Sequence, residues 1–147
     1  MGKPGTGKTH HAIAIGMKAA QAGHSVFCTS VKRLATKIRK AQERGNLDIL
    51  FKQILTTKLW LLDDWGVVSM PRDVSEEIFD LFDRRKHNSA MIITSNRDVD
   101  EWPQVFSDPV LASAAIDRMF ENAHICIYDG DSYRMKGRIK FKEIDNE

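Results

Sequence analysis

The sequence predicts an α/β domain with a mostly parallel sheet and helices on both faces. Short apolar runs typical of strands alternate with helix-periodic segments along the whole chain. Polar residues follow two of these runs at their carboxyl ends, where ligands bind in open α/β sheets. The length of 147 residues suffices for one domain with a real core, and not for two.

The first third of the chain predicts three helices and one strand. Residues 9–22 are apolar on most sides, as in a helix packed on a sheet, and Gly23 can terminate this helix. Residues 24–29 form a β-rich run, and Ser30 can cap the next helix. The apolar spacing of residues 31–44 and 47–55 then predicts two more helices.

The rest of the chain continues the alternation. Apolar runs predict strands over residues 59–64, 90–94 and 124–128. Helices are predicted over residues 73–86, with Asp73 and Glu76 as a capping box, and over residues 109–120. Loops are expected over residues 65–71 and around Trp102-Pro103. We assign residues 1–136 to the domain and 137–147 to a polar tail.

Composition narrows the class of protein. A hydrophobic content of 42%, a charged content of 29% and a net charge of +2 are those of an ordinary soluble protein. No apolar run is long enough to span a membrane and no signal-peptide pattern is present, so we expect a cytoplasmic protein. Cys28 and Cys126 lie in strand-like runs and are expected to be buried free thiols.

The chain is organised around a phosphate-binding motif at its start. Gly2, Gly7, Lys8 and Thr9 fit the P-loop pattern G-x-x-x-x-G-K-[ST]. Such glycines let successive N–H groups point at phosphate oxygens, while the lysine reaches the β- and γ-phosphates and the threonine ligates Mg²⁺. The predicted nucleotide-binding residues are Gly2, Pro4, Gly5, Thr6, Gly7, Lys8 and Thr9, with ATP and Mg²⁺ as cofactors.

The strand that should lead into the P-loop has no residues in this sequence. A P-loop connects a strand to a helix, yet only Met1 precedes Gly2. We therefore expect either an upstream segment or a fragment, and a sheet whose first central strand is missing. Unpaired backbone groups in the neighbouring strands would then weaken ATP binding, and a preceding apolar strand would restore it.

Two further polar signals complete the candidate site. Asp63 and Asp64 end the apolar run of residues 59–64, and Thr94-Ser95-Asn96 ends the next strand. Beside a P-loop, Asp63 is interpreted as the Walker B carboxylate that holds Mg²⁺ opposite Thr9. Asp64 is interpreted as the acid that orients and deprotonates the attacking water.

On these residues the chain resembles the IstB/DnaC branch of the AAA+ ATPases. These are transposition helper ATPases of insertion sequences and bacterial helicase loaders. The P-loop, Leu61–Gly66 and Ile93–Asn96 match both. The segments Glu101-Trp102, Asp108–Ala112 with Asp117-Arg118, and Gly130–Arg134 resemble IstB more closely than DnaC.

The resemblance implies a P-loop AAA+ fold with strand order 5-1-4-3-2 and further residue roles. Asn96 would be sensor 1, and Arg118 the arginine finger that reaches the nucleotide of a neighbouring subunit in a homo-oligomer. Arg134 would contact the nucleotide or the subunit interface. Asp64 replaces the usual glutamate, which bears on the hydrolysis rate more than on ATP binding.

The resemblance also implies partners. The helpers contact a transposase or a replicative helicase through an N-terminal domain that this sequence does not contain. The helix over residues 31–44 carries a basic face, and the related ATPases turn the corresponding elements toward DNA. We therefore expect sequence-independent contacts with the DNA backbone from Lys32, Arg33, Lys37 and Lys40.

Four functions remain open from the sequence. The favoured one is a DNA-associated, Mg²⁺-dependent ATPase that assists transposition, and the first alternative is a helicase loader. A nucleotide kinase also has a P-loop, but no arginine-rich lid insert or acceptor-binding pattern is present, whereas Asn96 and Arg118 are. The last alternative is an inactive remnant that lacks its central strand.

Overall fold

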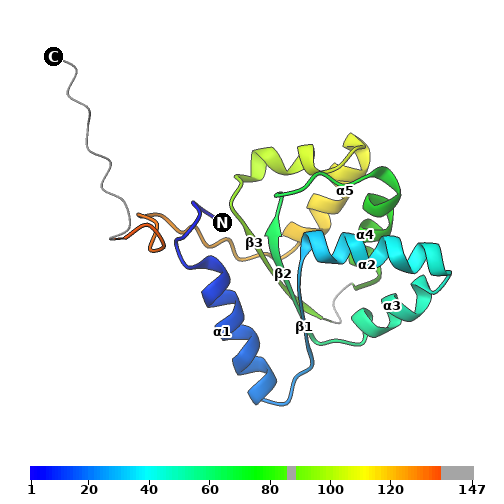
Figure 1. The fold of residues 1–147 in the computed structure, drawn as a ribbon, viewed down its shortest axis with the longest axis horizontal. Helices are drawn as coiled ribbons and strands as arrows, with labels where there is room; N and C mark the ends of the chain where they lie inside the picture. Colours follow the sequence, from blue (N-terminus) through cyan, green and yellow to red (C-terminus); the bar gives the residue numbers. More distant parts are fainter. Residues whose placement is uncertain (86–88, 137–147) are drawn as a thin grey trace.

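The computed structural model describes residues 1–85 and 89–136. In these residues a parallel sheet of three strands, in the order β1-β2-β3, separates two layers of helices (Figure 1). The elements in chain order are α1 (Lys8–Gln21), β1 (Val26–Ser30), α2 (Val31–Arg44), α3 (Leu47–Leu55), β2 (Leu59–Trp65), α4 (Arg72–Arg85), β3 (Ala90–Ser95), the 3₁₀ helix η1 (Val99–Val105) and α5 (Pro109–Phe120). The predicted α/β class and alternation of elements are confirmed.

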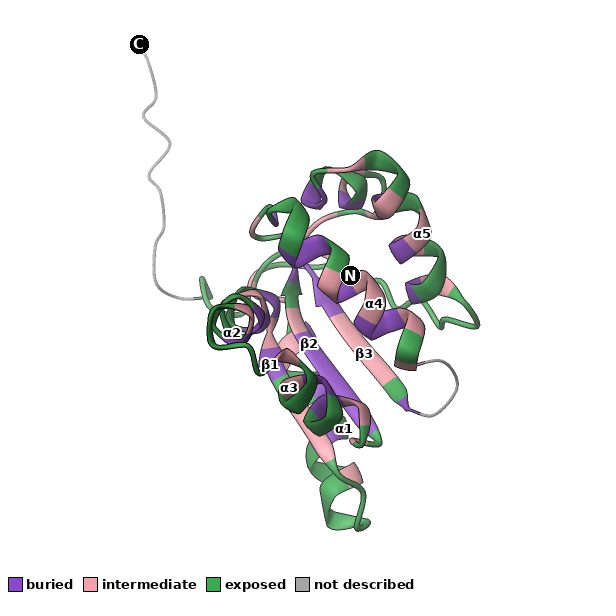
Figure 2. Ribbon diagram, turned by 90° about the vertical axis from the view of Figure 1, so that its right-hand side faces the viewer, coloured by how far each residue is buried: buried purple, intermediate pink, exposed green. Residues whose placement is uncertain are grey.

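The hydrophobic core lies on one face of the sheet. Strand β2 is buried over Leu59–Leu62 (Figure 2), and its Trp60 and Leu62 pack into the cluster formed with α2, α3, α4 and α5. Among the helices of the described residues, α1 covers the opposite face, where it buries Lys8, Ala12 and Gly16. Helix α1 therefore packs on the sheet as expected, but only along the narrow strip that these three residues form.

The outer surface of α1 remains apolar and accessible. Ile13, Ile15 and Met17 are 44%, 54% and 59% exposed. Apolar side chains on most sides of a helix usually indicate burial by neighbours on several sides. Among the helices and strands of the described residues, α1 makes extensive contacts with β1, β2 and β3 and with no other element.

The predicted helix ends are confirmed in α1 and α2 and wrong in α4. Ser30 accepts a hydrogen bond from the Arg33 N–H, and Gly23 and Gly45 adopt positive φ after the helices they end. Helix α4 begins at Arg72, so Asp73 lies within its first turn. Glu76 pairs with Arg72 at 2.9 Å instead of closing a capping box.

Three other expectations are corrected. Residues 124–128 form no regular strand; of these, Tyr128 makes an isolated parallel bridge with Gly2, because no strand of residues 1–85 and 89–136 lies alongside the segment. Trp102 and Pro103 belong to η1 rather than to a loop. Cys28 and Cys126 are free as expected but exposed, since edge strand β1 and the 124–128 segment are covered incompletely.

Two sequence-based assignments fall outside the described residues. They are Lys86, the expected last residue of the fourth helix, and the tail over 137–147. Over residues 1–85 and 89–136, no helix combines the length and the apolar character that crossing a membrane requires.

Candidate nucleotide site

The P-loop wraps around the N-terminus of α1 at the carboxyl edge of the sheet. Gly7 is the N-cap residue of α1, so the loop ends where the helix dipole is positive. Gly2 and Gly5 have φ of 140° and 80°, which disfavour any residue with a side chain. A Cβ on Gly2 would lie 2.0 Å from the Tyr128 carbonyl oxygen, and one on Gly5 would lie 2.0 Å from Ser132 Oγ.

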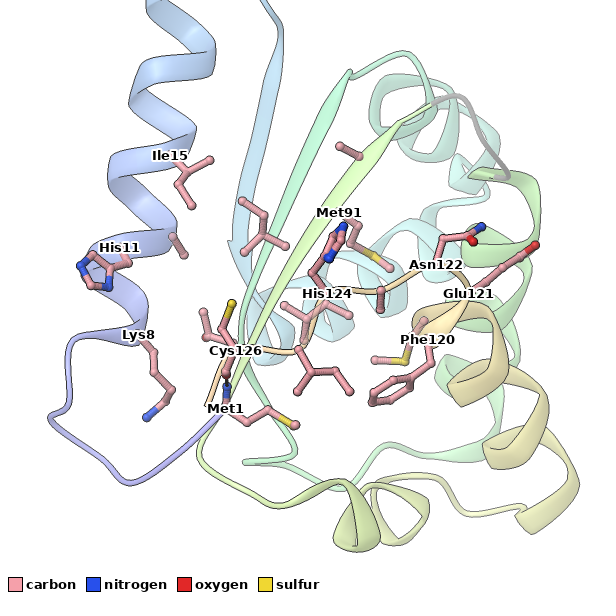
Figure 3. Close-up of a pocket in the computed structure, with 18 of the residues that line it drawn as sticks. Met1, Lys8, His11, Ile15, Met91, Phe120, Glu121, Asn122, His124 and Cys126 are labelled. Atoms are coloured by element: carbon pink, nitrogen blue, oxygen red, sulfur yellow. Dashed lines mark hydrogen bonds between the residues drawn. The ribbon is translucent and has the colours of Figure 1, made fainter. Parts of the chain in front are cut away.

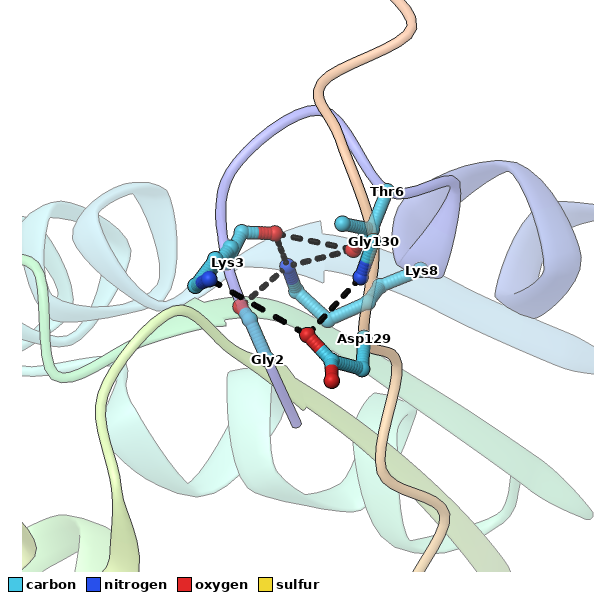
Figure 4. Close-up of polar contacts among 6 residues, drawn as sticks. All are labelled: Gly2, Lys3, Thr6, Lys8, Asp129 and Gly130. Atoms are coloured by element: carbon cyan, nitrogen blue, oxygen red, sulfur yellow. Dashed lines mark hydrogen bonds and ion pairs between the residues drawn. The ribbon is translucent and has the colours of Figure 1, made fainter.

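Lys8 folds back into its own loop. Its Nζ donates to the carbonyl oxygens of Gly2 and Lys3, both at 2.5 Å (Figure 4). Burial lowers the pKa of Lys8, while the carboxylates of Asp64 and Asp63 act in the opposite direction. The ammonium group is thus held inside the ring of backbone that would surround a phosphate group.

Thr9 and Asp63 meet directly, as expected for the two magnesium ligands. The Thr9 hydroxyl donates to Asp63 Oδ1 at 2.8 Å, although the residues lie 54 positions apart in the sequence. A hydroxyl and a carboxylate are hard oxygen ligands of the kind that Mg²⁺ prefers, together with water and substrate phosphates. The described residues contain no group of three or more His, Cys, Asp or Glu side chains suited to a metal. The pair therefore fits a magnesium ion shared with a nucleotide.

Thr94 links the two acidic residues, a role that the sequence patterns did not indicate. Its hydroxyl donates to Asp63 Oδ1 and accepts a hydrogen bond from the Asp64 N–H at 3.1 Å. In the sequence, this role of Thr94 could have been inferred from its position at the end of the predicted strand of residues 90–94, which follows the strand that ends in Asp63 and Asp64. Thr94 fixes the orientation of Asp63 from the neighbouring strand.

Asp64 lies at an irregularity that sets its direction. The register between β2 and β3 shifts between Leu62 and Trp65, and Asp64 has φ of 59°, a left-handed conformation that is uncommon outside glycine. In a regular strand, Asp63 and Asp64 would point to opposite faces. Here both carboxylates lie close enough to Lys8 to affect its pKa, and Asp64 is exposed to solvent.

The other predicted site residues lie outside the group formed by Lys8, Thr9, Asp63 and Asp64, and they differ in solvent exposure. Asn96 follows β3 directly and is exposed. Arg134 belongs to the segment over the P-loop, and its charge acts on Lys8 to lower the lysine pKa. Arg118 lies in the last turn of α5, half exposed, where its Nε forms an ion pair with Asp83 at 3.1 Å.

Residues 128–133 lie across the P-loop, an arrangement that the sequence patterns did not predict. The Tyr133 N–H donates to the Gly5 carbonyl oxygen at 3.0 Å, and the Tyr128 hydroxyl lies 2.9 Å from His11 Nδ1. Lys3 pairs with Asp129 at 4.0 Å (Figure 4). Sequence spacing carries no signal for interactions across so many residues.

The four candidate DNA-binding residues of α2 lie on its exposed face. Lys32, Arg33, Lys37 and Lys40 form no ion pair within residues 1–85 and 89–136. Lys32 and Lys40, with Arg39, also line a groove of about 410 Å³ between α2 and residues 68–71. Arg33 and Lys37 lie outside the lining of this groove.

Comparison with known proteins gives one family. The sequence profile described as "IstB-like ATP binding protein" matches residues 1–141. A protein of Pseudomonas aeruginosa named as an ATP-binding protein of insertion sequence IS21 is 36% identical over 140 residues, which cover 95% of this chain and 53% of the relative. The corresponding protein of insertion sequence IS5376 from Geobacillus stearothermophilus is 31% identical, over 92% of this chain and 54% of the relative. The chain thus spans about half the length of these relatives.

Solved structures agree on the fold. AMPPCP-bound DnaA from Aquifex aeolicus superposes with a TM-score of 0.71 at 26% identity, over 92% of this chain and 41% of that one. The DnaC helicase loader superposes with a TM-score of 0.68 at 22% identity, over 87% of this chain and 75% of that one. At that identity the likeness to DnaC concerns the fold alone. The predicted P-loop AAA+ architecture is confirmed.

Proposed function

Because the chain belongs to the IstB-like ATP-binding protein family, we propose that it binds Mg²⁺-ATP and hydrolyses it in an assembly on DNA that assists transposition. One observation carries the proposal: the Thr9 hydroxyl of the P-loop meets the Asp63 carboxylate at the end of β2, 2.8 Å away. The relatives' association with insertion sequences supports the transposition role.

Each residue of the site has a defined task in this proposal. The backbone N–H groups of Gly5, Gly7, Lys8 and Thr9, at the end of the loop and the N-terminus of α1, bind the phosphates. Lys8 leaves its loop carbonyls for the β- and γ-phosphate oxygens. Thr9 and Asp63 would hold Mg²⁺, which neutralises phosphate charge. Asp64 accepts a proton from the attacking water, and Asn96 orients that water beside the γ-phosphate.

Replacing Asp64 by asparagine tests this assignment. We expect ATP binding to be retained and turnover to fall by about 10²–10⁴-fold, the usual contribution of a general base. Asparagine tolerates the left-handed backbone at this position, so the loop geometry should persist. The measurement is ATP affinity and steady-state hydrolysis in a chain preceded by an apolar strand.

Asp100→Asn is the matched control, since Asp100 is an exposed acid in the first turn of η1, away from the P-loop, with no ion pair among the described residues. It should hydrolyse ATP at the parent rate. Parent-rate hydrolysis by Asp64→Asn would show that Asp64 is an ordinary loop residue.

We also propose that α2 contacts the DNA backbone. Its exposed cations form no ion pair in the described residues, and Lys32 and Lys40 border the groove between α2 and residues 68–71. Phosphate contacts of this kind position a protein on DNA without reading its sequence.

Replacing Lys32, Lys37 and Lys40 by alanine should weaken binding to all DNA sequences equally. The slope of log affinity against log salt should flatten by roughly one unit for each lysine–phosphate interaction that the substitutions remove. The control is the triple alanine variant of Lys18, Lys52 and Lys58, which removes the same charge from exposed positions elsewhere. An unchanged slope in the α2 variant would identify its basic face as merely solvated.

A further inference from the structure

The carboxyl ends of β2 and β3 do not pair one residue to one. Two residues of β2, Asp63 and Asp64, lie opposite one residue of β3, Thr94. The regular pairs on either side are Leu62 with Ile93 and Trp65 with Ser95. A bulge of this kind redirects a side chain that would otherwise follow the alternation of the strand. Thr94 is therefore the residue of β3 that faces both acids.

Buried residues hold this bulge in place at both ends. Leu62 and Trp65 are fully buried, and the Ser95 hydroxyl donates to the Trp65 carbonyl oxygen at 2.8 Å. A slip of β2 by one residue along β3 would turn its side chains from the core to the other face of the sheet. The backbone between the two buried residues therefore has to accommodate the extra residue, and Asp64 does so with its φ of 59°.

The hydrogen bonds of Thr94 fix the direction of its hydroxyl proton. An N–H group can only donate, so the Thr94 oxygen accepts from the Asp64 N–H, and its own proton goes to Asp63 Oδ1. The same Oδ1 accepts the proton of the Thr9 hydroxyl. The Thr9 oxygen thereby keeps its lone pairs for a metal ion. Asp63 Oδ2 accepts no hydrogen bond from residues 1–85 or 89–136, so this oxygen is also left for the metal ion or its water.

The Thr94 side chain is itself held firmly. It is 5% exposed, and the branch at its Cβ restricts rotation about χ1. With Lys8 it lines a cavity of about 540 Å³ between α1 and β3, and Figure 3 shows Lys8 at the end of this cavity nearest the P-loop. A residue of different volume would alter this cavity as well as the hydrogen bonds. Valine has nearly the shape of threonine and differs from it by the hydroxyl.

We propose that Thr94 is a positioning residue of the nucleotide site, whose hydroxyl orients Asp63 for Mg²⁺ and holds the bulge that directs Asp64 toward the attacking water. The inference rests on the proposed ATPase function. Thr94 acts through the two acids and not on the nucleotide itself. Because both acids are bound to one hydroxyl, the metal ligand and the proton acceptor are set in position together.

Thr94→Val removes this hydroxyl, and two measurements report the result. In the chain without nucleotide, the Asp64 amide hydrogen should exchange at least about tenfold faster, because its acceptor is gone. In calorimetric ATP titrations, the gain in affinity that Mg²⁺ provides should fall by about 10–100-fold, the usual cost of removing a group that orients a metal ligand. The affinity for ATP without Mg²⁺ should equal that of the parent chain. The titrations use the form of the chain described for Asp64→Asn.

Thr94→Ser and Thr29→Val are the controls. Serine keeps the hydroxyl and should restore both values, whereas valine is favoured in strands, so both valine variants should fold. Thr29 is a buried threonine near the carboxyl end of β1, and its hydroxyl donates to the Ser30 carbonyl oxygen at 3.3 Å rather than to a carboxylate. Thr29→Val should therefore match the parent chain in both measurements.

Three results would overturn the proposal: parent-like values in folded Thr94→Val, equal losses in the two valine variants, or no recovery in Thr94→Ser. The proposed function fails in a different way, because Mg²⁺ would then not raise the affinity of the parent chain for ATP. In that case the exchange of the Asp64 amide hydrogen alone decides whether Thr94 holds the bulge.

Discussion

Replacing Lys8 by alanine is expected to abolish ATP binding at ordinary nucleotide concentrations. Truncating a buried charge that pairs with an oppositely charged group costs about 2–5 kcal/mol, which corresponds to roughly 30- to 5,000-fold in affinity. Lys8 is 7% exposed, and its ammonium group already lies among the loop carbonyls that surround the phosphate position. ATP titration monitored by calorimetry measures the loss.

Lys18→Ala is the matched control, because Lys18 is an exposed lysine on the same helix. Its affinity for ATP should equal that of the parent chain. A melting temperature for Lys8→Ala near that of the parent, in the absence of nucleotide, separates loss of binding from loss of folding. Parent-like affinity in folded Lys8→Ala would contradict the assignment of the P-loop.

Replacing Arg118 by alanine is expected to leave ATP binding intact and to remove most turnover. An arginine supplied by a neighbouring subunit offsets the charge that builds on the γ-phosphate and can raise the rate by roughly 10³–10⁵-fold. Within the chain, Arg118 pairs with Asp83 and lies 3.9 Å from Glu121, with half of its side chain exposed. Such exposed pairs contribute little stability, so the arginine can exchange partners when subunits assemble.

Two experiments distinguish an arginine that acts on a neighbouring subunit from one that only pairs with Asp83. One varies the protein concentration, and the other mixes two inactive variants. If it acts on a neighbour, activity per subunit should rise with protein concentration and with DNA that templates the assembly. Arg118→Ala mixed with Lys8→Ala, each inactive alone, should regain turnover, because one subunit supplies the nucleotide and the other the arginine. Both measurements use the chain preceded by an apolar strand. Activity linear in concentration, with no recovery on mixing, would limit Arg118 to its pair with Asp83.

The sequence alone predicted correctly those features that depend on interactions between residues close together in the chain. The bounds of α2, α3 and α5 were predicted to the residue, because apolar spacing and the cap at Ser30 act within a few positions. Motif spacing likewise predicted that Thr9 and Asp63 would face each other, and the structure places them 2.8 Å apart. Binding phosphate and Mg²⁺ restricts which residue types can occupy the positions of Thr9 and Asp63.

Only the tertiary structure decided the features that depend on neighbours. Residues 124–128 have the composition of a strand, but without a strand beside them they form a single bridge, because ladder hydrogen bonds need a partner. Because no strand of the described residues lies beside them, Cys126 is also exposed and β3 lies at the edge of the sheet. The direction of Asp64 follows from a register shift against β3, and the hydrogen bond between Tyr133 and Gly5 spans most of the chain. Sequence patterns determine which segments can pair and which groups can bind phosphate, whereas pairing itself depends on what occupies the adjacent space.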